Sequence, residues 1–131
     1  MYKETYKDPK FQKKEEKTSN VPLEDIQVIL RGDSEKMISV AKDFAENNLR
    51  GRSTASIRKV YSEVKKMKEY DKYKLDLLRA KLAYVSKRHD ELRSLTDLLD
   101  ATIKEVKKDS FKHFQNFFEA ILAYFYKFGK E

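Results

Sequence analysis

The chain has 131 residues and no cysteine, which suits one domain with a single hydrophobic core and excludes disulfide bonds and thiolate metal sites. Its formal net charge of +7 favours acidic partners such as nucleic acid. The positive charge is concentrated, because residues 50–89 hold thirteen Lys and Arg against four Asp and Glu, a balance of +9, while the rest of the chain sums to −2. One part of the molecule is therefore expected to attract polyanions.

Residues 1–20 are rich in Lys and Glu and show neither helical nor strand periodicity, so we expect a mobile arm before a helical domain at 21–131. The arm is either a solvated tail or a segment that orders on a partner. Its first residues lack the apolar core of a secretory signal, and the most apolar stretch, 117–128, is shorter than the roughly 20 residues of a bilayer span. These features predict a cytoplasmic protein that does not contact membranes.

The first elements after the arm are short. Residues 23–31 suit a short helix or a buried strand, and we favour the helix, which would stop at Gly32. Asp33 or Ser34 can cap a second helix, whose apolar residues recur every 3.6 positions up to Leu49. Ser53 or Thr54 can cap a third, with an apolar face between residues 57 and 67.

The later elements are longer. A seam of apolar residues from Leu75 to Val106 predicts either one bent helix or two helices, the second capped by Asp90. A last helix begins at residue 109 or 110 and runs to Phe128, with Gly129 expected in a left-handed cap. No Gly or Pro falls between residues 52 and 128, and strand-like alternation is absent there. The sequence thus predicts an all-α fold, a single-domain bundle of about five or six helices.

The last helix is unusually aromatic. Eight of the sixteen Phe and Tyr residues fall between residues 111 and 128, and they cover two helix faces. Such a helix must be buried nearly all round. It is either the central core helix or a helix that packs one face on another protein chain.

The chain offers little material for catalysis. His89 and His113 are distant in sequence and belong to no zinc-ligand pattern, and Asp109, on the same helical face as His113, is better explained as a helix-start residue. The three glycines are isolated at helix ends, so no phosphate-binding loop is present. We therefore expect no enzyme activity, metal or cofactor.

Helical periodicity sorts the basic residues onto faces. Arg58, Ser62 and Lys65 form a stripe on the third helix, and Lys74, Lys81 and Arg88 recur every seven residues on the fourth, with Tyr84 on the same face. Cations so arranged could meet successive phosphates while the ring contacts a sugar or base. Several of the lysines suit a solvated face equally well. Guanidinium groups fit phosphate geometry better, and five arginines cluster in this region, namely Arg50, Arg52, Arg58, Arg79 and Arg88.

Three segments, read together, resemble a known family. They are Ser53–Lys59 (STASIRK), Leu78–Tyr84 (LRAKLAY) followed by Arg88, and Phe114–Tyr124 (FQNFFEAILAY). In order and spacing they resemble the small subunit of the type III-A (Csm-type) CRISPR interference complex, over about residues 20–131. The sequence departs from that pattern at Ala80, where a proline is common, and at Lys130, where a second glycine is common.

The resemblance implies a non-catalytic helical subunit, several copies of which stack beside the guide RNA and line the path of the target RNA. Its partners would be guide and target RNA, other Csm-type subunits and copies of itself. The residues expected to neutralise target phosphates without reading bases are Arg50, Arg52, Arg58, Arg79, Lys81 and Arg88. The alternative is a helical adaptor that presents its basic face to an acidic protein and oligomerises through its aromatic helix.

Overall fold

The computed structural model describes residues 21–130, so the arm predicted over residues 1–20 lies outside the described residues. The described part contains helices and loops without strands, and the prediction of an all-α bundle is confirmed. Its helices are α2 (Leu23–Leu30), α3 (Ser34–Asn48), α4 (Ala55–Lys66), α5 (Lys72–Arg88), α6 (Arg93–Glu105) and α7 (Phe111–Phe128). Short 3₁₀ turns, η1 (Asp90–Leu92) and η2 (Lys108–Ser110), precede α6 and α7.

The helix boundaries settle two open alternatives. Residues 23–30 form a helix rather than a strand, and residues 71–108 form two helices, which the turn η1 separates. Asp33 caps α3, because its carboxylate accepts a hydrogen bond from the Lys36 N–H at 3.0 Å. Asp71 caps α5 in the same way, through the Lys74 N–H at 3.0 Å.

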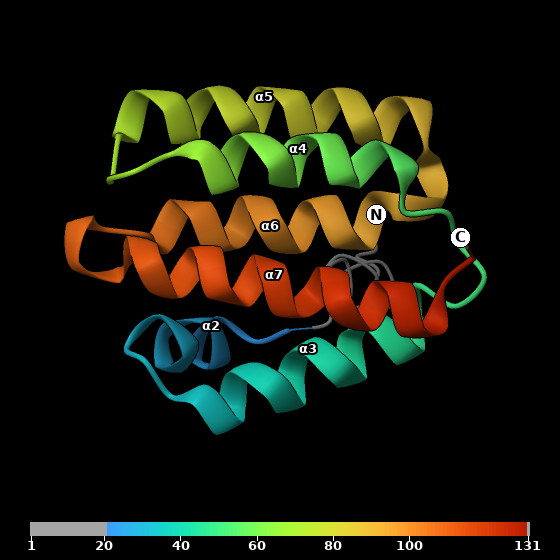
Figure 1. The fold of residues 1–131 in the computed structure, drawn as a ribbon, viewed down its shortest axis with the longest axis horizontal. Coiled ribbons are helices and arrows are strands. Elements are labelled where there is room, and N and C mark those ends of the chain that lie inside the picture. Colours follow the sequence, from blue (N-terminus) through green and yellow to red (C-terminus); the bar gives the residue numbers. More distant parts are fainter. Residues whose placement is uncertain (1–20, 131) are drawn as a thin grey trace, which may run out of the picture.

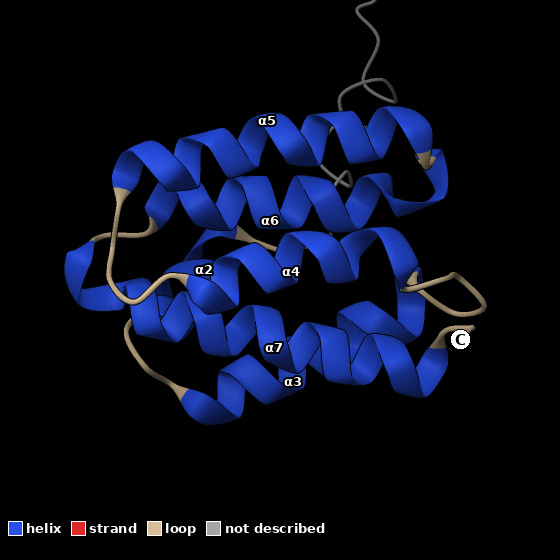
Figure 2. Cartoon of the chain, turned by 45° about the horizontal axis from the view of Figure 1, so that its top comes forward, coloured by secondary structure: helices blue, strands red, loops and turns tan. Residues whose placement is uncertain are grey.

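The helices stack in three layers (Figure 1), in which α4 and α5 form one outer layer, α2 and α3 the other, and α6 and α7 lie between them. The most extensive packing joins α3 to α7 and α5 to α6. The turned view in Figure 2 shows the loops gathered at the two ends of the bundle. This arrangement places the most basic pair of helices, α4 and α5, on one side of the molecule.

Helix α7 is the central core helix. Its largest buried side chains are Phe114, Phe117, Phe118 and Phe125, each at most 1% exposed. Burial is not complete around the helix, because a strip of residues on α7 stays exposed, namely Lys112, Asn116, Glu119, Ala123, Tyr126 and Lys127. Neighbouring helices therefore cover most of its circumference, and the rest faces solvent.

Gly129 ends α7 for a reason other than the predicted left-handed cap. Its φ is −86°, whereas a Cβ at this position would lie 2.6 Å from the Phe125 carbonyl oxygen and 2.7 Å from that of Arg52. Only glycine permits so close an approach of two backbone segments. Next to it, the Lys130 N–H donates to the Arg52 carbonyl oxygen at 2.6 Å. The loop between α3 and α4 is thus fastened to the end of α7.

A second fastening joins α7 to the far end of α4. The side-chain amide of Gln115 donates to the carbonyl oxygens of Val64 and Met67, both at 3.0 Å. Val64 belongs to the last turn of α4 and Met67 is its C-cap residue, at the helix end where carbonyls lack the usual helical partners. Gln115 therefore caps α4 from a neighbouring helix and fixes its position against the core.

Candidate nucleic-acid interface

A groove runs along the outer layer between α4 and α5. It consists of three adjacent cavities, of about 500, 330 and 330 Å³, which follow one another from the start of α4 to the loop between the two helices. Neighbouring cavities share lining residues, because Glu63 and Lys81 border the first and second, and Lys66 and Lys74 border the second and third. We call this feature the α4–α5 groove.

Cations line the groove from both helices in alternation. In the first cavity Lys59 of α4 faces Lys81 and Arg88 of α5, and in the second Lys66 faces Lys74 and Lys81. The order along the groove is therefore Arg88, Lys59, Lys81, Lys66, Lys74. Seven-residue spacing places side chains on one helix face about 10.5 Å apart, so the two interleaved rows present a positive charge about every 5 Å.

Tyr84 stands beside the groove at its Arg88 end. The Arg88 guanidinium donates to the Tyr84 hydroxyl oxygen at 3.0 Å and lies 5.7 Å from the centre of the ring. Tyr84 is nevertheless 62% exposed. The predicted grouping of Lys74, Lys81, Tyr84 and Arg88 is present in the structure, because each of the four lines the groove.

One ion pair crosses the groove. The Lys81 ammonium lies 2.6 Å from the Glu63 carboxylate, which joins α5 to α4 near the middle of the groove. Both side chains are about half exposed, so the pair is held in a solvated environment and contributes little to stability. A phosphate arriving at Lys81 would compete with Glu63 for the same ammonium group.

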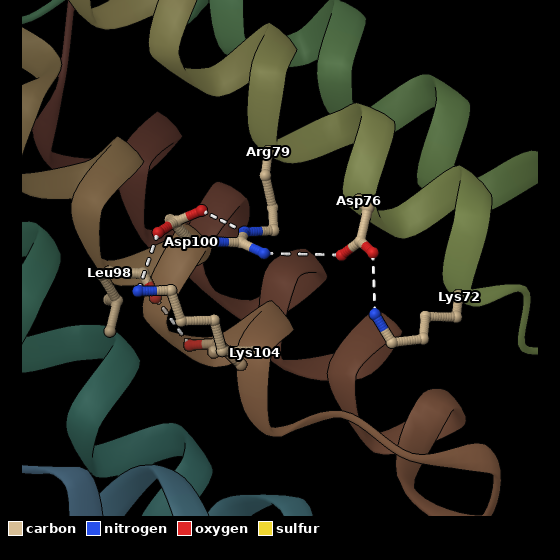
Figure 3. A network of polar contacts seen from close by, with 7 residues as sticks. Lys72, Asp76, Arg79, Leu98, Asp100 and Lys104 are labelled. Carbon is tan, nitrogen blue, oxygen red and sulfur yellow. Dashed lines mark hydrogen bonds and ion pairs between the residues drawn. The ribbon is translucent and has the colours of Figure 1, made fainter.

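Arg79 lies on a different side of α5. Residues two positions apart in sequence point about 200° apart around a helix, so Arg79 is turned away from Lys81 and the groove. Its Nε donates to Asp100 of α6 at 2.7 Å, and one of its terminal nitrogens lies 3.5 Å from Asp76 (Figure 3). The hydrogen bond to Asp100 is the main cause that raises the pKa of Arg79. Arg79 therefore links α5 to α6.

The ion pairs around Arg79 continue in both directions along the α5–α6 contact. Lys72 lies 2.8 Å from Asp76, and its hydrogen bond is the main reason that the pKa of Asp76 is lowered. At the other end Lys104 lies 3.7 Å from Asp100. Figure 3 shows these side chains in one row between the two helices.

The remaining predicted arginines occupy other places. Arg58 lies about 140° around α4 from Glu63, so the stripe of Arg58, Ser62 and Lys65 lies on a flank of α4 that does not line the groove. Apolar residues of α4 pack on the core between these two flanks. Arg50 lies in the loop before α4, 3.1 Å from Glu46 and 5.0 Å from the ring centre of Phe128, and Arg52 follows in the same loop. This loop is at the end of the bundle where α4 begins and α5 ends.

A model of the family described as Csm2 Type III-A matches residues 31–131, which include all the helices from α3 onward. The chain belongs to the Csm2 type III-A family. It is thus a small subunit of the type III-A Csm complex, as the resemblance of the three segments predicts. No curated protein and no solved structure matches the chain.

The groove of this Csm2-family chain contains two cations that are not among the predicted phosphate contacts, Lys59 and Lys66 of α4. Their seven-residue spacing equals that of Lys74, Lys81 and Arg88, and this shared period is the signal that could have found them. Arg58, the arginine of α4, lies on the other flank of that helix.

The two histidines lie apart in the structure. His89 lines the first cavity of the groove, whereas His113 lines a separate cavity with Arg31 and Asp109. Within residues 21–130 no group of three or more His, Cys, Asp or Glu side chains is arranged to hold a metal ion. Among the same residues no helix has both the length and the apolar character needed to cross a lipid bilayer.

Proposed function

We propose that this subunit holds the target RNA in the α4–α5 groove through its phosphates, without sequence preference and without catalysis. The observation that carries the proposal is the alternation of five cations from two helices along one groove. From Lys74 to Arg88 the groove extends about 21 Å along α5, which suits about six nucleotides at 3.4 Å each. Family membership in the Csm complex supports RNA as the polyanion.

The six residues expected to contact phosphate take different parts in this proposal. Lys81 and Arg88 contact the strand inside the groove. Arg50 and Arg52 extend the path over the neighbouring loop, at the end where α4 begins. Arg79 is assigned a structural part instead, because carboxylates of α5 and α6 already occupy its guanidinium. Arg58, on the other flank of α4, is left for contacts outside the groove.

Assembly strengthens binding in this proposal. Each copy offers a short groove, so an isolated subunit binds weakly, and copies stacked along the guide–target RNA bind together. Sequence is then read by guide pairing, since the groove supplies phosphate contacts only.

Binding of random single-stranded RNA at several salt concentrations tests the proposal. The five groove cations predict a slope of log K against log salt of about −3.5, which contacts by Arg50 and Arg52 would make steeper, and each lost contact makes the slope about 0.7 shallower. The double variant Lys81→Ala/Arg88→Ala is therefore expected to lose about 1.4 from the slope.

The matched control is Lys42→Ala/Lys112→Ala, which removes the same charge from exposed positions on α3 and α7, outside the groove. It should leave the slope almost unchanged. The proposal is wrong if binding is indifferent to salt, or if the control variant weakens binding as much as the groove variant.

A second candidate function is contact with an acidic protein through the basic layer. It is favoured by the exposure of Tyr73 and Leu77 on α5, which are 75% and 51% exposed. Sedimentation with and without RNA separates the two functions. Assembly with the other Csm subunits that needs no RNA, and that is lost in a Tyr73→Ser/Leu77→Ser variant, supports the protein contact.

A further inference from the structure

The first cavity of the α4–α5 groove has features that phosphate binding does not require. Its volume of about 500 Å³ is in the range of small-molecule sites, and a row of phosphates needs no such hollow. It lies at the groove end where α4 begins and α5 ends. Its lining combines an aromatic ring, cations and hydrogen-bonding groups, among them Ser56, Lys59, Glu63, Lys81, Tyr84 and Arg88.

The ring of Tyr84 is held in place at the wall of this cavity. Arg88 both donates a hydrogen bond to its hydroxyl oxygen and lies near its ring, so two contacts restrain one side chain. A restrained and exposed ring is a stacking platform for a nucleobase, and stacking of this kind accepts any base. Stacking is thus compatible with binding that ignores sequence.

The other lining groups suit the remaining parts of a nucleotide. Lys59 and Lys81 lie on opposite walls of the cavity and can meet the phosphates on either side of a base. The Ser56 hydroxyl can donate or accept a hydrogen bond at the edge of a base. Base, phosphates and polar edge atoms therefore each have a counterpart in one cavity.

We infer that this cavity is a subsite for one unpaired nucleobase of the bound strand, which stacks on Tyr84 while its flanking phosphates lie on Lys59 and Lys81. The inference rests on the proposed function, since the cavity is part of the same groove. It adds that at least one nucleotide enters the groove unpaired, so a single strand is preferred to a perfect duplex.

Tyr73 provides the matched control for Tyr84. It lies on the same helix and is 75% exposed, but it lines none of the three cavities of the α4–α5 groove. A strand that stacks on any exposed tyrosine of α5 would respond to both rings. A strand with a base in the cavity responds to Tyr84 alone.

The experiment compares two probes on the full chain by fluorescence anisotropy at low salt. One is a uridine hexamer, and the other is an abasic strand with the same number of phosphates. The uridine strand is expected to bind about five- to tenfold more tightly than the abasic strand, because stacking of one base on an aromatic ring contributes about that much to affinity. Tyr84→Leu should abolish this difference, whereas Tyr84→Phe and Tyr73→Leu should preserve it, with folding of each variant verified by circular dichroism.

The possible outcomes separate this inference from the proposed function. If neither strand binds, the proposed function fails. If both bind equally to the unaltered chain, phosphate binding stands and the base subsite is wrong. If Tyr84→Leu and Tyr73→Leu lose the same affinity for the uridine strand, the stacked base does not lie in the first cavity. If a glutamate hexapeptide binds as tightly as the uridine strand, the base subsite is wrong and an acidic protein is the favoured partner.

Discussion

Glu63 carries a negative charge into the middle of the α4–α5 groove, where it holds the ammonium group of Lys81 at 2.6 Å. In the proposed function, a bound strand replaces this carboxylate by a phosphate at Lys81. The residue therefore keeps Lys81 oriented across the groove in the free subunit, but it opposes binding once the strand arrives.

Substituting Glu63 by Gln should therefore strengthen RNA binding. We expect an affinity gain of about two- to fivefold at moderate salt, the worth of one exposed ion pair. Filter binding measures it. The control Glu35→Gln makes the same charge change at an exposed position on α3, and an equal gain in the control would show that net charge alone is responsible.

Asp97 of α6 has a raised pKa, chiefly because it is partly buried, and the neighbouring carboxylate of Asp100 adds to the effect while Arg93 opposes it. Its charged form is thus less favourable in the folded chain than in the unfolded chain. The stability linked to this group is fully present below the unfolded pKa of about 3.8 and is lost as pH rises through the folded pKa.

Asp97→Asn should accordingly raise the melting temperature at pH 7, and the gain should shrink as pH falls toward 4. Thermal unfolding followed by circular dichroism at several pH values checks both parts. A difference between variant and parent that does not change with pH would contradict this explanation.

At the scale of elements, Arg79 and its carboxylate partners join α5 to α6, the contact that holds the outer layer on the core. Removing the guanidinium leaves Asp76 and Asp100 without their shared cation.

Arg79→Ala should lower the melting temperature without changing the salt slope of RNA binding. The loss should be smaller than that of a core truncation, because the group is partly exposed to solvent. Arg79→Lys keeps the charge but not the forked arrangement of guanidinium donors, and it should recover part of the lost melting temperature. A slope that becomes shallower by about 0.7 in Arg79→Ala would instead place Arg79 on the RNA.

Some helix boundaries could be predicted from the sequence and others could not. Helices α3, α4 and α7 were predictable because their apolar residues follow the helical period and their ends are marked by capping residues or glycine. The break between α5 and α6 could not be predicted, because the apolar spacing continues across it. The break depends on a local 3₁₀ turn, in which the Leu92 N–H donates to the His89 carbonyl oxygen at 2.8 Å.

The same distinction applies to the groove. Lys74, Lys81 and Arg88 could be aligned from the sequence because one helix carries all three. The pairing of Arg79 could not, because its partner Asp100 lies 21 residues away on the next helix. Which flank of α4 faces α5 is likewise set by tertiary packing, and periodicity alone does not choose between two flanks.

At the scale of the whole molecule, charge is divided between opposite layers. Residues 21–49, which form the α2–α3 layer, hold three Lys and Arg against six Asp and Glu, whereas residues 50–89 carry the balance of +9. The α6–α7 layer separates them (Figure 1). A polyanion therefore approaches one side of the subunit and is repelled by the other, which sets the orientation of each copy before contact.

The separating layer depends on the aromatic core of α7. Phe117→Ala, at a fully buried position, should lower the free energy of unfolding by about 3 to 5 kcal/mol. Tyr126→Ala, on the exposed strip of the same helix, should change it by no more than about 0.5 kcal/mol. Urea denaturation with an unchanged m value measures both, and equal costs would mean that α7 is not the core helix.

Gln115 has a consequence for how the subunit meets its ligand. Its side-chain amide joins the end of α4 to the buried helix α7, so the α4 side of the groove is held in a fixed position. In the proposed function, an incoming strand therefore has to adapt its own backbone to an α4 wall whose position is set during folding.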